Sequence, residues 1–306
     1  MTASFEPIAE RIGATRQRLQ TILNEFETGG GPRIEAWRTY QRATEPGSQA
    51  APMTLVRGNR RRTPPHVSTV KEVADQFAYL SCVLAMLRSL DQLPEVNVPE
   101  QVKLIVLDEF DARCEDGAAR RHERYSLADS EGWNQLASCR LQRLPLGLYV
   151  FNIAGIPRSN WLRCPAREKI SLARFLAFQM HGFAPVFEVH LPRLTNRHVT
   201  EAEVDASHLL LARVAQMNPR VKGLYSSAWY IDPAVATIQP RLAFLREFFL
   251  KNGGFVHRLG VTPSSIEDAL RKSATRRRLY DEGKYQPTAW ARYWPRAAML
   301  RWAGLS

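Results

Sequence analysis

The chain has 306 residues, of which 45% are hydrophobic, and its formal net charge at pH 7 is +12. This apolar content can bury a large core. No apolar run approaches the ~20 residues that cross a bilayer, so we expect a soluble protein with no membrane partner. Glu6 and Glu10 come before any apolar run forms, which argues against a signal peptide.

The four cysteines lie far apart and form no Cys-x-x-Cys pair. That spacing argues against a structural zinc site and a disulfide framework, and it is typical of a reducing cytosol. We therefore expect a cytoplasmic protein without a bound metal.

The N-terminal part of the sequence predicts helices followed by a linker. Apolar residues at helical spacing predict an amphipathic helix from Glu6 to about Phe26. Residues 44–66 combine proline, glycine and arginine without periodicity, which indicates a linker or a surface loop. We expect an N-terminal helical arm over residues 1–43 and one main α/β domain over residues 67–306.

The next part of the chain mixes helical and strand patterns. The predicted elements are a helix from Thr69 to about Leu90, strands from Val102 to Leu107 and from Leu146 to Ala154, a return strand from Ser159 to Cys164, and a helix from Pro165 to Met180.

Residues 184–258 alternate strands with helices, and the rest of the chain is organised around them. Thr200 and Glu203 form a capping box that begins one of these helices. The predicted elements are strands at 186–191, 221–231 and 255–259, and helices at 200–217 and 237–251. After them we expect a helix opened by Ser264 and Glu267, a helix at 275–282, a strand at 287–293 and a helix at 295–303. The alternation predicts parallel crossover units in a mixed α/β fold, with a largely central sheet flanked by helices.

Polar residues gather at the ends of these three strands. The candidates are Glu188, His190, Ser226, Ser227, Tyr230, Asp232, His257 and Arg258. Ligands of open α/β sheets bind outside the carboxyl ends of parallel strands. We therefore expect His190 and His257 to face one shared cavity, where a histidine can act as a base near neutral pH.

Two chemistries fit the same residues less well. A Ser-His-Asp hydrolase needs its nucleophile on a strand-to-helix elbow such as Gly-x-Ser-x-Gly, and no second glycine follows Ser226 or Ser227. A mononuclear iron site could use Glu188, His190 and His257, but the Glu-x-His order reverses the usual one.

The order of strands and helices over residues 184–259 resembles the second half of the GNAT acyltransferase fold. The resemblance implies that strand 186–191 splays away from strand 221–231 to admit the pantetheine arm of an acyl thioester such as acyl-CoA. It implies a base such as Glu188 or His190, and a tyrosine such as Tyr230 that protonates the leaving thiolate. Where the family has a glycine-rich pyrophosphate loop, this chain has Pro192 to Val199 without glycine, and Arg193 and Arg197 could pair with phosphates by charge.

Two functions follow from these patterns. The first is a small-molecule enzyme, a GNAT-like acyltransferase whose catalytic candidates are Glu188, His190, Tyr230, Asp232 and His257 and whose cofactor-binding candidates are Arg193, Arg197, Ser226, Ser227 and Arg258. The second is a non-catalytic basic protein whose arginine clusters bind nucleic acid or another polyanion. The last 120 residues or so also resemble a family of uncharacterised bacterial proteins, a resemblance that implies no activity.

Overall fold

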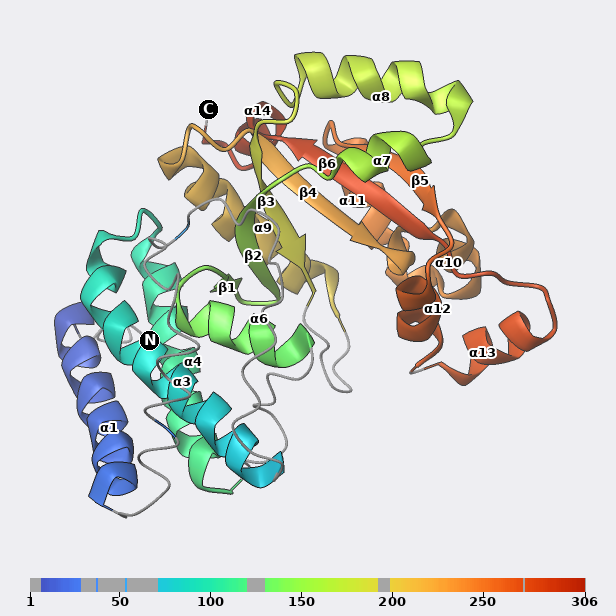
Figure 1. Ribbon diagram of the computed structural model, residues 1–306. Helices are drawn as coiled ribbons and strands as arrows, with labels where there is room; N and C mark the ends of the chain where they lie inside the picture. The colour runs from blue at the N-terminus through green and yellow to red at the C-terminus, as the bar shows by residue number, and fades with distance from the viewer. Residues whose placement is uncertain are drawn as a thin grey trace. The chain divides into compact units, whose positions relative to one another are not determined.

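A computed structural model describes residues 7–28, 37, 53, 71–119, 130–191, 199–271 and 273–305. The chain forms two compact units, Met1–Leu146 and Gly147–Ser306. Figure 1 shows the elements of each unit. The predicted linker at 44–66 lies outside the described residues except for Met53, so the predicted domain limits stay a prediction.

The first unit is helical. Its described elements are α1 (Ile8–Thr28), α3 (Lys71–Gln92), the 3-10 turn η1 (Leu93–Glu95), α4 (Glu100–Ala119), α6 (Ser130–Cys139) and the short strand β1 (Leu144–Leu146). Helix α1 packs against α3 and α4, and α3 packs against α6. Ile12, Leu19 and Leu23 supply the buried side of α1.

The prediction of a strand from Val102 to Leu107 is wrong, because these residues lie inside α4. A short apolar run fits a strand and a buried helix equally well by periodicity. Here Val102, Val106 and Phe110 recur at helical spacing and are all buried. The carboxylates expected at a strand end instead pair α4 with α1: Arg11 lies 2.8 Å from Asp108 and 3.2 Å from Asp111.

The second unit is built on a mixed sheet with the strand order β2-β3-β4-β6-β5. Its elements are β2 (Tyr149–Gly155), α7 (Arg158–Arg163), α8 (Ala166–Phe178), β3 (Pro185–His190), α9 (Glu201–Met217), β4 (Gly223–Ala228), η2 (Trp229–Ile231), α10 (Pro233–Ile238), η3 (Pro240–Leu242), α11 (Phe244–Lys251), β5 (Phe255–Gly260), α12 (Pro263–Leu270), α13 (Ala274–Asp281), β6 (Ala289–Pro295) and α14 (Arg296–Trp302). The predicted class, a mixed α/β fold with a sheet flanked by helices and a helical N-terminal part, is confirmed.

The strand directions differ from the predicted parallel set in one respect. Strands β3 and β4 pair in parallel as expected, but β6 lies between β4 and β5 and is antiparallel to both. The last strand of the chain thus enters the middle of the sheet. Periodicity gives the type of an element and not its neighbours, so this insertion was not visible in the sequence.

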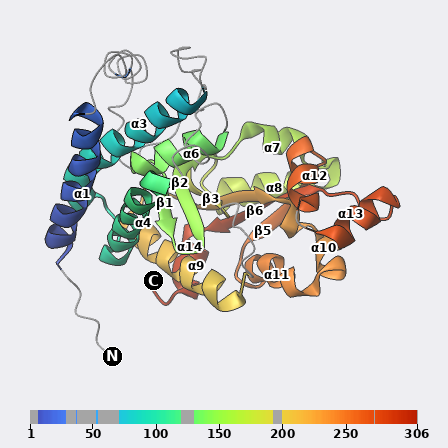
Figure 2. The ribbon, with the colours of Figure 1, turned by 90° about the horizontal axis from the view of Figure 1, so that it is seen from below.

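Helices cover both faces of this sheet (Figure 2). On one face Leu172 and Leu176 of α8 pack on Val186, Tyr225 and Tyr293. On the other face Phe249 of α11 and Trp302 of α14 contact Trp294 of β6. Helix α9 packs against both α11 and α14. Alternate residues of each central strand are therefore buried in different layers.

Two predicted elements were wrong because a proline begins or interrupts a helix there. Residues 159–164 were expected to be a return strand, but Pro157 precedes the helix α7 there and supplies its N-cap. The helix expected from Thr237 to Lys251 is interrupted: α10 ends at Ile238 and η3 separates it from α11, because Pro240 has no N–H to continue the helical ladder.

Candidate functional site

The parallel pair β3 and β4 separates soon after it forms. The two strands are paired only at Phe187 with Leu224 and at Glu188 with Tyr225. On its other edge β3 pairs with β2 up to His190, and β4 pairs with β6 up to Ala228. The ends of β3 and β4 therefore stay in the sheet while a gap opens between them.

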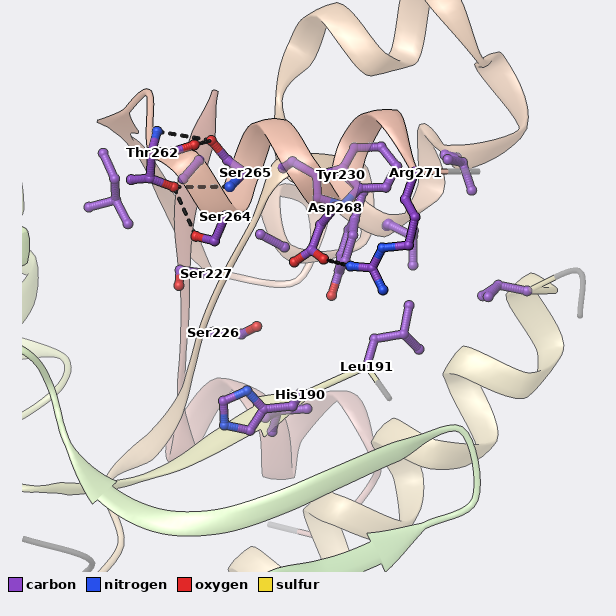
Figure 3. A pocket seen from close by; sticks show the side chains of 18 of the residues that line it. His190, Leu191, Ser226, Ser227, Tyr230, Thr262, Ser264, Ser265, Asp268 and Arg271 are labelled. Atoms are coloured by element: carbon purple, nitrogen blue, oxygen red, sulfur yellow. Dashed lines mark hydrogen bonds and ion pairs between the residues drawn. The ribbon is translucent and has the colours of Figure 1, made fainter. Parts of the chain in front are cut away.

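A cavity of about 530 Å³ lies at this gap. Its wall includes Val189, His190 and Leu191 from the end of β3, and residues 226–230 from the end of β4 and η2. Side chains of successive strand residues point to opposite faces of a sheet. Ser226 and Ser227 both line the cavity, so residues of both faces of the sheet contribute to its wall. Figure 3 shows His190 and Leu191 on one side of open space and the two serines on another.

His190 has a carboxylate beside it. Its Nε2 lies 3.7 Å from Oε2 of Glu188, and the same oxygen accepts a hydrogen bond of 3.2 Å from Nδ2 of Asn152. Glu188 and Asn152 are cross-strand partners on β3 and β2, so the sheet fixes this carboxylate. The His190 side chain is 41% exposed and lines the cavity, whereas Glu188 does not line it.

Tyr230 lines the cavity and is 9% exposed. It lies in η2, directly after β4, where the chain turns before α10. Its neighbour Asp232 does not line the cavity. The Asp232 carboxylate accepts a hydrogen bond of 3.0 Å from the N–H of Ala234 and caps α10. Burial raises the pKa of Asp232, and hydrogen bonds from the backbone of Ala234 and Thr288 partly oppose that rise.

His257 lies elsewhere in the unit. It is fully buried, and its ring stacks on Tyr293 with centroids 5.6 Å apart. Burial lowers the pKa of His257. His190 and His257 do not share the cavity, contrary to the prediction, because β6 lies between β4 and β5 and moves His257 one strand away.

Only some of the predicted cofactor-binding residues line the cavity. Ser226 and Ser227 line the cavity, but the exposed Arg258 of β5 does not. Arg193 and Arg197 lie outside the described residues.

Four other arginines line the cavity, and only one of them stands out in the sequence. Arg163, Arg241 and Arg271 are exposed, and only Arg276 belongs to a visible cluster of basic residues. Arg276 is buried over the ring of Trp229 at 4.3 Å and donates to the carbonyl of Ala269 and to Gln239. Arg271 pairs with Asp268, the acidic residue of the wall.

Helix α12 brings hydroxyl groups to the same cavity. It begins two residues earlier than the predicted capping box of Ser264 and Glu267: Thr262 is the N-cap and exchanges hydrogen bonds of 3.0 Å with Ser265. Thr262, Ser264 and Ser265 all line the cavity. Figure 3 shows these groups near the Asp268–Arg271 pair.

The described ranges hold neither a metal-binding cluster nor a membrane-spanning helix. No cluster of three or more His, Cys, Asp or Glu side chains there could hold a metal ion. No described helix combines the length and the apolar character needed to cross a membrane.

No protein-family model and no curated protein sequence matches the chain. Similar solved structures include an acyltransferase in complex with decanoyl-CoA, at 12% identity over 92% of this chain and 98% of that chain, with a TM-score of 0.44. Another is an acyltransferase in complex with decanoyl-CoA and teicoplanin, at 13% identity over 86% and 75%, with a TM-score of 0.46. A third, an acyltransferase mutant in complex with octanoyl-CoA, has 14% identity over 71% of this chain and 65% of that chain, and a TM-score of 0.42. These values are too low to transfer an activity.

Proposed function

We propose that this protein is an acyltransferase that binds an acyl thioester, such as acyl-CoA, in the gap between β3 and β4 and transfers the acyl group to a small-molecule amine. The observation that carries the proposal is the end of parallel pairing after Glu188 and Tyr225, where the cavity opens. The GNAT resemblance implies this feature, since the pantetheine arm of the donor lies between two parallel strands that separate.

His190 is the proposed base. The carboxylate of Glu188, 3.7 Å away, stabilises the imidazolium that forms when His190 takes a proton. The amine nitrogen attacks the thioester carbonyl carbon, a C–N bond forms and the C–S bond breaks. The nitrogen proton goes to His190, the leaving thiolate takes a proton from Tyr230, and exchange with solvent restores both groups.

The donor phosphates are assigned to the arginines around the cavity. Arg163, Arg241 and Arg271 are exposed on its wall, and guanidinium groups bind phosphate oxygens through paired hydrogen bonds. Arg193 and Arg197 follow β3 directly in the sequence and are proposed to take part by charge. Ser226 and Ser227 are the polar groups beside the proposed path of the pantetheine arm.

The first experiment measures donor binding through Trp229, which lines the cavity. Titration with CoA and with acyl-CoAs of increasing chain length should change the tryptophan fluorescence, and Trp229→Phe should remove most of the change. A chain with seven tryptophans needs this variant as the control. No saturable change with any acyl-CoA in the wild type would contradict the proposal.

The second experiment measures acyl transfer by release of free thiol. His190→Gln should lower kcat/KM by about 10²–10⁴-fold while the Kd for CoA stays within about threefold. His181→Asn is the matched control, because His181 is exposed, lies outside the cavity wall and has a left-handed backbone that asparagine tolerates. Full activity in His190→Gln would exclude His190 as the base.

Polyanion binding stays the second prediction, and no observation favours it. The clusters at Arg60–Arg62 and Arg120–Arg121 lie outside the described residues. In the cluster on α13, Arg276 is buried and Arg278 lies 3.8 Å from Glu282. Retention on DNA or RNA that weakens by ~10³-fold between 50 and 200 mM salt would support this function.

A further inference from the structure

Arg292 is a charged side chain in the interior of the second unit. It lies on β6, is 0% exposed, and is one of the largest fully buried side chains of the chain. Its guanidinium lies 4.5 Å from the ring centroid of Phe249, 5.6 Å from that of Tyr230 and 5.7 Å from that of Tyr149. Aromatic faces offset only part of the cost of removing such a cation from water.

The hydrogen bonds of Arg292 are incomplete. Nη1 donates to the carbonyl of Leu245 at 3.4 Å, whereas Nε and Nη2 have no partner among the described residues. Nε and Nη2 lie on one edge of the guanidinium, the edge that binds a carboxylate through two parallel hydrogen bonds. The hydroxyl of Tyr149 makes no hydrogen bond of ordinary geometry within that part of the chain, but it lies close enough to Arg292 for the guanidinium to lower its pKa against the effect of burial. Burial raises the pKa of Tyr149 to about 12, so this hydroxyl is protonated and can donate.

Arg292 lies one side chain behind the wall of the cavity. It is the cross-strand partner of Ser226, so the two side chains share a face of the sheet. Ser226, Tyr230 and Leu245 line the cavity, and Arg292 contacts the last two. Tyr149 precedes Val150, the partner of His190, so its side chain lies on the face opposite His190, where its ring centroid is 5.7 Å from the guanidinium of Arg292.

We propose that Arg292 selects the acyl acceptor: it binds the carboxylate of an amino carboxylate, and Tyr149 completes the polar end of the acceptor subsite. The exposed arginines of the wall are assigned to the donor phosphates, so the buried cation serves a different ligand. This inference rests on the proposed acyl transfer but is tested separately from it.

The test uses product-like probes, because they report the subsite without turnover. N-hexanoylglycine and N-hexanoylglycinamide differ only in whether a carboxylate or a neutral amide stands at the end. Isothermal titration of the full chain should show at least about tenfold tighter binding of the acid. Glycine and glycinamide, compared as acceptors in the thiol-release assay, should differ in kcat/KM in the same direction.

Variants assign the preference to Arg292. Arg292→Met should remove the preference for the acid. It should raise the Kd of N-hexanoylglycine about tenfold or more and leave the Kd of N-hexanoylglycinamide within about twofold. Arg292→Lys, which keeps the charge but loses the two-donor edge, should keep only a small part of it and can be used if the methionine variant does not fold. Arg213→Met removes an exposed arginine of α9 that does not line the cavity, and it should leave the preference unchanged.

Equal binding of acid and amide, or no measurable binding of the acid, would overturn the assignment. So would a preference that survives in both Arg292 variants, because the exposed arginines would then be its source. Acyl transfer to amines without any preference for a carboxylate would refute only the role of Arg292. A wild type that prefers the acid but transfers no acyl group would refute only the proposed function.

Discussion

At the scale of single residues, polar groups that follow the same pattern in the sequence serve different purposes in the structure. Asp232 and His190 both come at the ends of strands predicted from the sequence, yet the carboxylate of Asp232 is turned to the backbone of α10 and the imidazole of His190 to the cavity. The Asp-Pro pair explains the first case, since proline at the first position of a helix favours a capping residue before it.

Asp232→Ala should therefore lower the free energy of unfolding by about 0.5–2 kcal/mol, the usual cost of a lost N-cap. Asp232→Asn keeps an acceptor at the same place and should lower the free energy of unfolding by only about a few tenths of a kcal/mol. Chemical denaturation of both variants measures the difference. If Asp232→Asn is stable but inactive in acyl transfer, the carboxylate has a chemical role beyond the cap.

His208 predicts how stability depends on pH. Its ring lies 4.4 Å from Phe248 and 5.4 Å from Tyr149 and Trp294, and neither nitrogen has a hydrogen-bond partner within the described ranges. Burial, and then the charge of Arg292, lower its pKa well below the ordinary value. As the pH falls through about 6.5, His208 therefore binds a proton in the unfolded chain but stays neutral in the folded chain.

The free energy of unfolding should consequently fall as the pH drops below about 6.5, by up to about 1.4 kcal/mol per pH unit for this one group, until the lowered folded pKa is reached. His208→Leu should reduce that slope. Ser207→Ala, a non-titrating change on the same helix, should lower stability equally at pH 7.5 and pH 5.5. Denaturation at several pH values distinguishes these results, and an unchanged slope in His208→Leu would contradict the assignment.

At the scale of elements, the start of β4 sets how closely the central strands approach. Gly223 has a φ of +158°, and a Cβ added there would lie 2.4 Å from the carbonyl oxygen of Trp294 on β6. Gly223 is opposite Pro295 and precedes Leu224, where the short pairing with β3 begins. The absence of a side chain allows the paired part of β4 to fit against β6 before the gap opens.

Gly223→Ala should cost about 3 kcal/mol or more, because the obstacle is backbone and cannot rotate away. Gly155→Ala, at the end of β2 where nothing lies within 4 Å of the added carbon, should cost less than about 0.5 kcal/mol. Melting temperatures of the two variants test the contrast. Similar values would mean that β6 adjusts to the added methyl group.

At the scale of the whole molecule, the sequence was a good guide to elements where turn and cap signals were strong. Thr200 and Glu203 form the capping box that their spacing predicts, and Pro165 and Asn218 lie at helix ends near the predicted places. The sequence was a poor guide where a result depends on long-range pairing. The insertion of β6, the burial of Arg292 and the arrival of Arg163 and Arg271 at the cavity all depend on which strands become neighbours.

The compact second unit should be sufficient for donor binding. Every residue found in the cavity wall lies between Arg163 and Ala289, inside Gly147–Ser306. A fragment of residues 147–306 should unfold in a single transition and bind CoA with a Kd within about fivefold of the full chain. Calorimetry and the fluorescence titration measure both. A folded fragment that does not bind CoA would mean that residues of the first unit take part.

The position of the cavity, with residues of both sheet faces in its wall, also has a kinetic consequence. An opening between β3 and β4 that is lined from both faces lets two reactants approach the same point from opposite sides, so neither must leave before the other enters. Both substrates would then be bound together at the moment of transfer, with no acyl group resting on the protein. Initial rates measured against one substrate at several fixed concentrations of the other should give intersecting double-reciprocal lines. Parallel lines would indicate a covalent acyl intermediate, for which Ser226 and Ser227 are the nearest hydroxyl groups at the gap.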